Sequence, residues 1–544
     1  MILKKIKDLW IPQSIIAAVL SAAAVMGASG YIEELLEQNR DMQGLAGAVT
    51  PLSWLTIAVI FGLLGYMVFD RSRCIKYREA TGGRSLKKDK GKYPRDWYSL
   101  MDYFTGADPY RIDPSTLPEG KWYKTRGVIL GKVGNKLVYR LSKDAGSVLV
   151  AGLPGDGKTT AIVIPTAAVF GGSCFVVDIK GDVLRGVRKI IKALGIKRKI
   201  LVFNPSDLKS VHFDPFGGLE QMSPAEVEVM IDSMAHILIP DEESKESKFF
   251  VDGARSFFIG IFFFFYERGA VPPFMDFIKA MLTNGFEVWL KTIHDQGMEQ
   301  SKKYLESYMG ANEKNTGGQY NKLIESLRPL TLGALPSLLN DKGTCINAEM
   351  LQKGYDIYIE LPQHLIKQYS SITTLISSSF MQSWMRQKDN TEKKPRPVLM
   401  ILDEFAQMHF DADMITGALA TLRSKGVTLM MIVQSIAQLE KNYGENNART
   451  IMETCSYKCI LSCGDPESME YFSKLFGKKR VLKVSTTNAD KSVTRSVNEA
   501  EEFVFKPEDF AALNAMGDGG KIAIQAKGKY ILADKCFWFK DLRI

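Results

Sequence analysis

The sequence predicts an α/β protein whose core is interrupted by an all-helical insertion and preceded by a pair of membrane-spanning helices. Apolar, strand-like runs alternate with helical patterns over 126–222 and again over 346–544, which is the rhythm of an α/β domain. Between these ranges, 223–345 has apolar residues at spacings of three and four, which are typical of helices. Two long apolar runs lie within 1–70.

The bulk composition is that of a folded protein with several domains. The chain has 544 residues, of which 46% are apolar and 24% are charged, and this length supports a large core. The formal net charge of +9 is modest for the length, and it favours an anionic partner. Seven cysteines are scattered without a close-spaced framework, which indicates a reducing compartment.

Each apolar run near the N-terminus is long enough to cross a bilayer. The runs are Ile11–Ile32 and Pro51–Phe69, and a spanning helix needs roughly 20 residues. Lysines precede the first run, basic residues follow the second, and the connector is acidic. Because cytoplasmic flanks carry the positive charge, both ends are expected inside. We therefore predict a transmembrane hairpin over 1–70 that anchors a cytoplasmic domain in the cell (cytoplasmic) membrane, followed by a basic linker over 71–125.

Two other interpretations of the N-terminus remain open, namely a single span and a cleaved secretory signal peptide, which has a similar composition. The second run and its basic flank favour a retained two-span anchor. A further apolar run, Phe257–Tyr266, is too short to span and follows charged residues. We predict that it is a buried core helix.

The two halves of the core supply the expected strands. In 126–222, strand, loop, helix and strand follow one another, as in a βαβ unit. The remaining strands fall in 346–544, which ends with a pattern typical of a closing hairpin over 519–539. The expected strands are two short ones around Gly134-Asn135, then Ser147–Gly152, Ser173–Asp178, Lys199–Phe203, Tyr355–Glu360, Pro397–Asp403, Val427–Val433 and Lys458–Cys463.

The stretch from Gly152 to Thr159 reads Gly-x-x-x-x-Gly-Lys-Thr and lies between a buried strand and the start of a helix. This context identifies a phosphate-binding loop rather than a plain glycine turn. Gly152, Gly155 and Gly157 let the backbone curl so that its N–H groups face a phosphate. The helix N-terminus adds partial positive charge.

The end of this loop supplies the side chains that bind a nucleoside triphosphate. Lys158 is expected to bind the β- and γ-phosphates, and Thr159 to give a hydroxyl to Mg²⁺. Thr160 follows directly and is expected to complete the nucleotide-binding set. The sequence therefore predicts ATP and Mg²⁺ as cofactors.

The second part of the site follows two later strands. Asp403 ends an apolar strand, where its carboxylate can hold Mg²⁺, and Glu404 is a candidate base that orients water onto the γ-phosphate. Gln434 ends the next strand. Its side chain is expected to contact the γ-phosphate or the attacking water. The alternative is that Gln434 merely caps the loop at the end of the strand. The pair Asp403–Glu404 favours ATP hydrolysis over nucleotide binding alone.

These motifs, in this order, resemble the type IV coupling proteins, the membrane-anchored ATPases of conjugative DNA transfer and type IV secretion. The resemblance covers nearly the whole chain. It departs from the family pattern at Ile179, where proline is common, at Asp156, where a small hydroxyl residue is usual, and in lacking a long acidic C-terminal tail. The segments that carry it are "GLPGDGKT", "VVDIKGD", "FNPSD", "FDPF", "ILDEFAQM", "LRSKGVTLMMIVQSIAQLEKNYG" and "FGKKRV".

The resemblance implies a RecA-like P-loop NTPase core, a homo-oligomer that is a hexameric ring or assembles with nucleotide, and an all-α domain facing the cytoplasm. It implies ATP hydrolysis coupled to delivery of a relaxase–single-stranded DNA complex, or of a protein, to a membrane secretion channel and its ATPases. It makes Arg423 a candidate to reach a neighbour's nucleotide, the alternative being a surface arginine. The segment Asp178–Asp182 is either the family's second-strand motif or a solvated charge cluster.

Two other functions share these motifs. A membrane-anchored double-stranded DNA translocase of the chromosome-segregation type has a similar core but usually a long linker and a winged-helix reader. A receptor that binds nucleotide with little turnover is the other alternative.

Cys455, Cys459 and Cys463 lie four apart, without a nearby histidine, so we expect them to pack on one buried strand face rather than bind metal.

Overall fold

The computed structural model describes residues 110–542, apart from 145, 243, 389–394, 490–491 and 518. The predicted transmembrane hairpin over 1–70 and the linker up to 109 lie outside the described residues. Within them, the chain divides into two compact units. The larger unit holds 112–477 and 505–542, and the other includes 478–504.

The larger unit is built on an eleven-stranded mixed sheet in the order β2-β1-β13-β12-β9-β3-β8-β7-β4-β6-β5. The strands from β9 to β5 in this order are parallel, and the remaining neighbours are antiparallel. The strands are β1 Gly127–Val133, β2 Lys136–Leu141, β3 Val148–Ala151, β4 Ser173–Ile179, β5 Lys199–Phe203, β6 Tyr355–Leu361, β7 Val398–Leu402, β8 Val427–Val433, β9 Tyr457–Ile460, β12 Lys521–Ala526 and β13 Lys529–Asp534.

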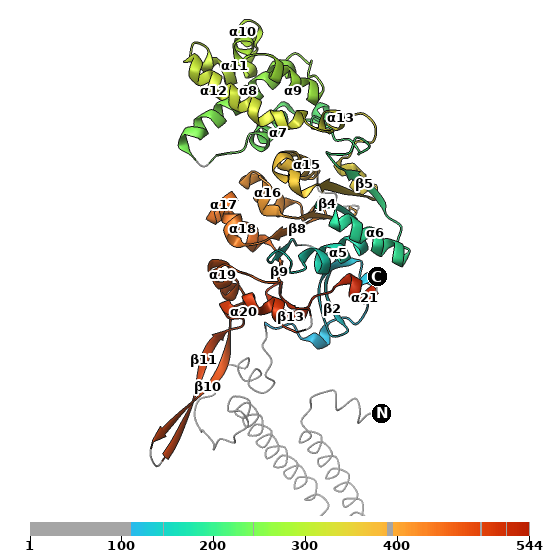
Figure 1. The fold of residues 1–544 in the computed structure, drawn as a ribbon, viewed down its shortest axis with the longest axis vertical. Helices are drawn as coiled ribbons and strands as arrows, with labels where there is room; N and C mark the ends of the chain where they lie inside the picture. Colours follow the sequence, from blue (N-terminus) through green and yellow to red (C-terminus); the bar gives the residue numbers. More distant parts are fainter. Residues whose placement is uncertain are drawn as a thin grey trace, which may run out of the picture. The chain divides into compact units, whose positions relative to one another are not determined.

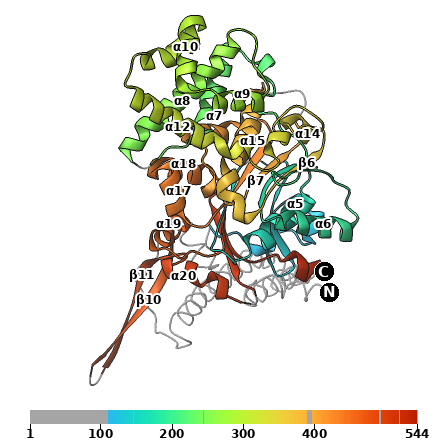
Figure 2. The ribbon, with the colours of Figure 1, turned by 45° about the horizontal axis from the view of Figure 1, so that its top comes forward.

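Helices cover both faces of the parallel part of the sheet (Figures 1 and 2). Alternate residues of β4 show the two faces: Val176 packs in the cluster that includes α5 and α6, while Phe175 lies 4.8 Å from the Phe380 ring of α15. Burial on both faces explains why these strands are continuous apolar runs. The helices of the core are α5 Ile164–Val169, α6 Asp182–Leu194, α14 Ala348–Gln352, α15 Ile366–Arg386, α16 Ala412–Thr421, α17 Ile436–Tyr443, α18 Glu445–Thr454, α19 Pro466–Phe476, α20 Pro507–Ala512 and α21 Trp538–Leu542.

The chain between β5 and β6 folds into helices, as expected for the range 223–345. Ser223 accepts a hydrogen bond from the Glu226 N–H, and the Glu226 carboxylate accepts one from the Ser223 N–H. This reciprocal cap starts the first helix of the series. The helices are α7 Pro224–Leu238, α8 Lys245–Tyr266, α9 Phe274–Thr283, α10 Phe286–Gln296, α11 Glu299–Leu305, α12 Glu313–Leu327 and α13 Leu335–Leu338.

Helix α8 forms the centre of this helical region. Of the described helices it alone is long and apolar enough to cross a membrane, and 67% of its most apolar window is buried inside the protein. Phe257, Phe258 and Phe262 are fully buried, and the Phe258 and Phe277 rings lie 5.4 Å apart. The prediction of a buried core helix at Phe257–Tyr266 is confirmed.

The segment 478–504 forms an antiparallel hairpin that the sequence analysis did not predict. Strands β10 (Lys478–Ala489) and β11 (Ser492–Phe503) pair without interruption, from Lys478 opposite Phe503 to Ala489 opposite Ser492. The segment had been assigned to the core range 346–544. Its many charged and polar residues give a weak apolar alternation, which is why the pattern of a half-buried strand is hard to see.

A buried ion pair ties the phosphate-loop helix to the amino-terminal edge of the sheet. Arg198 Nη2 donates to Asp356 Oδ1 over 2.7 Å, and the two side chains are 9% and 2% exposed. The same guanidinium donates to the carbonyls of Phe170, over 2.9 Å, and Gly172, over 3.0 Å. Asp356 Oδ1 also accepts from the Cys174 N–H over 2.9 Å. The pair therefore joins the end of α5, the start of β4 and β6.

Removing Arg198 should destabilise the fold strongly. We expect Arg198→Ala to lower the free energy of unfolding by about 3–5 kcal/mol, because it leaves the buried Asp356 carboxylate without a cation to balance its charge. Arg185→Ala is the matched control, since Arg185 pairs with Asp182 on the surface and exposed pairs contribute little. Chemical denaturation of the full chain measures both variants. Equal, small effects of the two substitutions would contradict this assignment.

Candidate functional site

The loop after β3 has the backbone of a phosphate cradle. Gly155 and Gly157 have φ of 88° and 87°, values that residues with a Cβ rarely adopt. Among the described residues, the N–H groups of Gly155 and Gly157 have no hydrogen-bond partner, so they are available to an anion. Successive backbone N–H groups in such turns form anion-binding concavities.

The helix that follows the loop begins with a wide turn. Thr159–Val163 is a π-helical segment, and α5 continues from Ile164. Pro165 accounts for this, because proline has no N–H to donate to the carbonyl four residues earlier and its ring crowds that carbonyl. Such π turns inside helices occur frequently at functional sites.

Asp156 shapes the loop from within. Its Oδ2 accepts a hydrogen bond from the Leu153 N–H over 2.7 Å and another from the Ser462 hydroxyl, and the side chain is buried. Ser462 follows β9, so this contact joins the loop to the neighbouring strand. Sequence reasoning treated Asp156 only as a departure from the family pattern and missed this role. The signal available was a carboxylate inside a loop whose N–H groups need acceptors.

Lys158 lies in the loop with its ammonium group buried. It donates to the Gly152 carbonyl and, over 3.0 Å, to the Leu153 carbonyl. Burial lowers the pKa of Lys158, and the nearby carboxylates of Glu404 and Asp403 oppose that shift. The structure therefore brings Lys158 together with the two acidic residues that follow β7.

The register of three adjacent parallel strands sets this arrangement. Ala151 of β3 is opposite Val433 of β8, and Met431 of β8 is opposite Leu402 of β7. The Gly152 N–H donates to the Val433 carbonyl over 3.3 Å. The phosphate loop, Gln434 and Asp403 thus follow the carboxyl ends of neighbouring strands, at one edge of the sheet.

Asp403 and Glu404 differ in burial and in backbone conformation. Asp403 is 8% exposed, and burial, together with the charges of Glu404 and Asp178, raises its pKa to about 7. Glu404 is only half-buried and has φ 55° and ψ 43°, a left-handed conformation that costs free energy for a residue other than glycine. Its Oε2 accepts a hydrogen bond from Gln434 Nε2 over 2.7 Å.

These residues fit a magnesium–nucleotide complex. The glycine turns offer backbone N–H groups to phosphates, and Lys158 supplies a cation. Thr159 and Asp403 offer the oxygen ligands that Mg²⁺ prefers. No group of three or more acidic, histidine or cysteine side chains forms a metal cage in the described part of the chain. Mg²⁺ usually binds through one or two carboxylates, phosphates and water.

Asp178 is not part of a solvated charge cluster, which corrects one of the two interpretations of its segment. It is fully buried at the end of β4. Its carboxylate accepts from the N–H groups of Val183, over 3.2 Å, and Leu184, over 2.9 Å. Burial raises the pKa of Asp178 to about 6. The residue caps the first turn of α6, and the exposed residues of the segment are Lys180 and Asp182, of which Asp182 pairs with Arg185.

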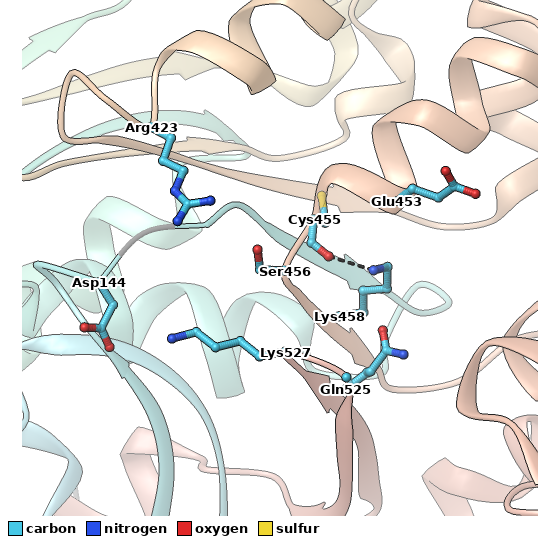
Figure 3. Close-up of a pocket in the computed structure, with 9 residues that line it drawn as sticks. Asp144, Arg423, Glu453, Cys455, Ser456, Lys458, Gln525 and Lys527 are labelled. Atoms are coloured by element: carbon cyan, nitrogen blue, oxygen red, sulfur yellow. Dashed lines mark hydrogen bonds between the residues drawn. The ribbon is translucent and has the colours of Figure 1, made fainter. Parts of the chain in front are cut away.

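Arg423 lies at the opposite edge of the sheet from the phosphate loop. It is exposed in the turn before β8, whose seven residues span about 20 Å. It lines a pocket of about 480 Å³, where the side chains of Arg423 and Lys527 extend toward the same space (Figure 3). This placement keeps Arg423 away from its own phosphate loop. The other lining residues are Asp144, Glu453, Cys455, Ser456, Lys458, Gln525 and Gly528.

The three cysteines spaced by four do not share one strand face, contrary to the sequence expectation. Only Cys459 lies in β9, whereas Cys455 ends α18 and Cys463 follows the strand. Strand β9 begins at Tyr457, one residue before the expected start, and ends at Ile460, so Cys463 lies beyond its end. All three thiols are free and buried, and burial raises the pKa of Cys455 and Cys459 to about 12.

Similar proteins include coupling proteins of type IV secretion and conjugal transfer proteins. VirD4 of Bartonella henselae, a type IV secretion system coupling protein, is 21% identical over 413 residues, which are 73% of this chain and 63% of VirD4. The chain thus spans less than two thirds of that relative. A probable conjugal transfer protein TraG of Sinorhizobium fredii is 23% identical over 534 residues, 92% of this chain and 79% of TraG.

Solved structures of the bacterial conjugative coupling protein TrwB share the fold. An unbound form is 15% identical with a TM-score of 0.57, and the match covers 77% of this chain and 90% of TrwB. TrwB in complex with ADP and Mg²⁺ gives the same identity and score, over 78% and 91% of the two chains.

The family described as type IV secretory system conjugative DNA transfer has a sequence model that matches residues 106–544 of this chain. That range contains the phosphate loop, the two acidic residues after β7 and the helical region. The chain belongs to this family.

Proposed function

We propose that this chain is an ATP-hydrolysing type IV coupling protein with a RecA-like P-loop core. The observation that supports this proposal best is the convergence of Lys158, Asp403, Glu404 and Gln434 at one edge of the sheet. These residues follow different strands and lie far apart in the chain, and their convergence supports a site for nucleoside triphosphate hydrolysis.

Each residue of the site has a distinct role in the proposed reaction. Lys158 binds the β- and γ-phosphates, while Gly152, Gly155, Gly157 and Thr160 hold the polyphosphate. Thr159 and Asp403 hold Mg²⁺, which when bound neutralises charge on the phosphates. These groups place the γ-phosphate beside Glu404.

Glu404 orients the attacking water and accepts its proton as the bond from the γ-phosphorus to the bridging oxygen breaks. Gln434 holds the Glu404 carboxylate through its amide N–H. The left-handed backbone of Glu404 is maintained by the surrounding fold, and strain of this kind gathers at functional positions. The Gln434 contact is therefore proposed to be part of the hydrolytic site.

The family supports a role in transfer. We propose that the protein recruits a relaxase–single-stranded DNA complex, or a protein, and delivers it to a secretion channel and its ATPases. The helical region 223–345 is the proposed cargo-facing domain, between core ranges 126–222 and 346–544. The range 1–70 is the proposed two-span anchor in the cytoplasmic membrane, and a ring of copies, a hexamer, is the proposed assembly.

The phosphate loop is tested by Lys158→Ala. We expect ATP turnover to fall to background and transfer of DNA or protein cargo to cease, because the γ-phosphate loses the loop's cation. Lys192→Ala, an exposed lysine on α6, is the control and should leave both unchanged. Steady-state ATPase assays and a mating or secretion assay provide the measurements. Near wild-type turnover in Lys158→Ala would reject the assignment.

Glu404→Gln separates binding from hydrolysis. The amide has the shape of the carboxylate but cannot accept a proton from water, so we expect nucleotide affinity to stay close to wild type. Turnover should fall by roughly 10²–10⁴-fold, the contribution of a general base. Equilibrium nucleotide binding and single-turnover kinetics measure the two effects. A parallel loss of affinity would contradict the role of Glu404 as the base, and undiminished hydrolysis would show that another group activates the water.

Arg423 is proposed to act on the nucleotide of a neighbouring copy. A head-to-tail ring joins two different surfaces of identical subunits, and Arg423 and the phosphate loop lie at opposite edges of one sheet. An arginine supplied by a neighbour raises hydrolysis by roughly a thousandfold or more in P-loop enzymes. We therefore expect Arg423→Ala to bind ATP and to lose turnover, while Arg449→Ala, another exposed arginine, keeps it.

Mixed assemblies decide whether Arg423 acts between subunits. Arg423→Ala subunits keep the loop, and Lys158→Ala subunits keep the arginine, so some sites in the mixture are complete. Steady-state ATPase activity of the mixture should exceed that of either variant alone. If the assembly forms and the mixture stays as inactive as its parents, Arg423 is a surface arginine without this role.

A further inference from the structure

The sheet order shows where the base of a bound nucleotide extends. Strand β3, which leads into the phosphate loop, has β8 and β7 on one side and β9, β12 and β13 on the other. The γ-phosphate end lies toward Asp403 and Glu404, which follow β7. Because the loop cradles the α- and β-phosphates along its length, the sugar and base leave on the other side, toward β9, β12 and β13.

The C-terminal hairpin ends at the same edge as the phosphate loop. Strand β9 is parallel to β3, β12 is antiparallel to β9, and β13 is antiparallel to β12. Strand β13 therefore runs in the direction of β3, and its carboxyl end, Asp534, lies at the nucleotide edge. The residues that follow Asp534 enter the region into which the base extends.

Phe537 is the residue of this segment that reaches the loop. A Cβ built on Gly157 would lie 3.0 Å from Cε1 and 3.4 Å from Cζ of the Phe537 ring, and 3.3 Å from Thr160 Oγ1. The ring thus packs against the last glycine of the loop. Cys536 and Trp538 on either side are buried in the core, at 0% and 8% exposure, and they fix the ring in place.

The Phe537 ring is only half-buried, although an aromatic ring gains most free energy by full burial. Its neighbours on the C-terminal side are one aromatic and one basic side chain. The exposed Phe539 ring lies 5.4 Å away at an angle of 36°, and Lys540 Nζ lies 5.4 Å from the Phe537 centroid. A partly exposed aromatic ring beside a phosphate loop, with a lysine ammonium over it, has the chemistry that a nucleobase can contact.

We propose that Phe537 is the nucleobase-binding residue of the site: the base of the nucleotide held by Gly152–Thr159 stacks on its ring. This inference rests on the proposed nucleotide site. Stacking uses the π face that every base has, so Phe537 contributes affinity for a nucleoside over bare polyphosphate without choosing between adenine and guanine. The ring is too far along the nucleotide to touch the γ-phosphate and is not a catalytic residue.

The test compares ATP with inorganic tripolyphosphate, which has the phosphates but no base. In the full-length protein purified in detergent, Phe537→Ala should weaken ATP binding by about tenfold or more, as loss of one stacked ring predicts. Tripolyphosphate binding should change less than about twofold. The ATPase KM should rise while kcat stays near wild type, and GTP binding should weaken as much as ATP binding.

Three further variants make the result specific. Phe537→Leu keeps an apolar side chain against Gly157 but lacks a π face, and it should behave like Phe537→Ala. Phe537→Trp should restore ATP affinity. Phe539→Ala is the matched control in the same C-terminal segment, and it should bind ATP as wild type does. Thermal unfolding of each variant shows whether the C-terminal segment stays folded, and Phe537→Leu serves if Phe537→Ala does not fold.

Two outcomes would overturn the proposal. Equal loss of ATP and tripolyphosphate binding in Phe537→Leu would show that the ring only shapes the phosphate loop, and unchanged ATP binding would show that the base lies elsewhere. Lys158→Ala keeps the failure of the underlying site distinct, because it should lose both ligands. If Lys158→Ala bound both as wild type does, the nucleotide site itself would be wrong, whatever Phe537 does.

Discussion

The in-register alignment of the parallel strands β3, β8 and β7 is the constraint on which the candidate site depends. Each strand is paired to its neighbour by backbone hydrogen bonds, so the residues that follow them emerge at one edge at fixed lateral spacing. The loop lysine, the two acidic residues and Gln434 meet because of this alignment. A shift of one residue in any strand would turn its side chains to the other face and break up the group.

Buried polar side chains hold the loops at both edges of the sheet. At the nucleotide edge, Asp156 joins the phosphate loop to Ser462, and Asp178 caps α6. At the other edge, Arg198 and Asp356 join α5, β4 and β6. A buried charge without a partner is strongly destabilising, so each of these contacts specifies one arrangement of its loop. The conformation of the phosphate loop is thus held in part by Asp156, through its contacts with Leu153 and Ser462.

The two edges of the sheet carry different surfaces, and in the proposed ring these surfaces would meet between neighbouring copies. The nucleotide site occupies the carboxyl ends of the parallel strands, and Arg423 and Lys527 line a pocket beside the turns before β8 and within the β12–β13 hairpin. Identical copies stacked head to tail would place these different surfaces against one another. The same hairpin leads to Phe537, so the C-terminal segment is proposed to contribute both to the nucleotide site of its own copy and to the surface that meets a neighbour.

By itself the sequence determined the α/β core, most of its strands, the helical insertion and the candidate residues from Gly152 to Gln434, because short motifs and apolar periodicity are local properties. It also determined the buried helix at Phe257–Tyr266. Only the tertiary structure decided the strand order, the hairpin β10–β11, the burial of Asp178 and the separation of the three cysteines. Contacts such as Asp156 with Ser462 and Gly157 with Phe537 join distant parts of the chain. Which distant segments meet is decided by packing of the whole sheet, and no local pattern in a single sequence records it.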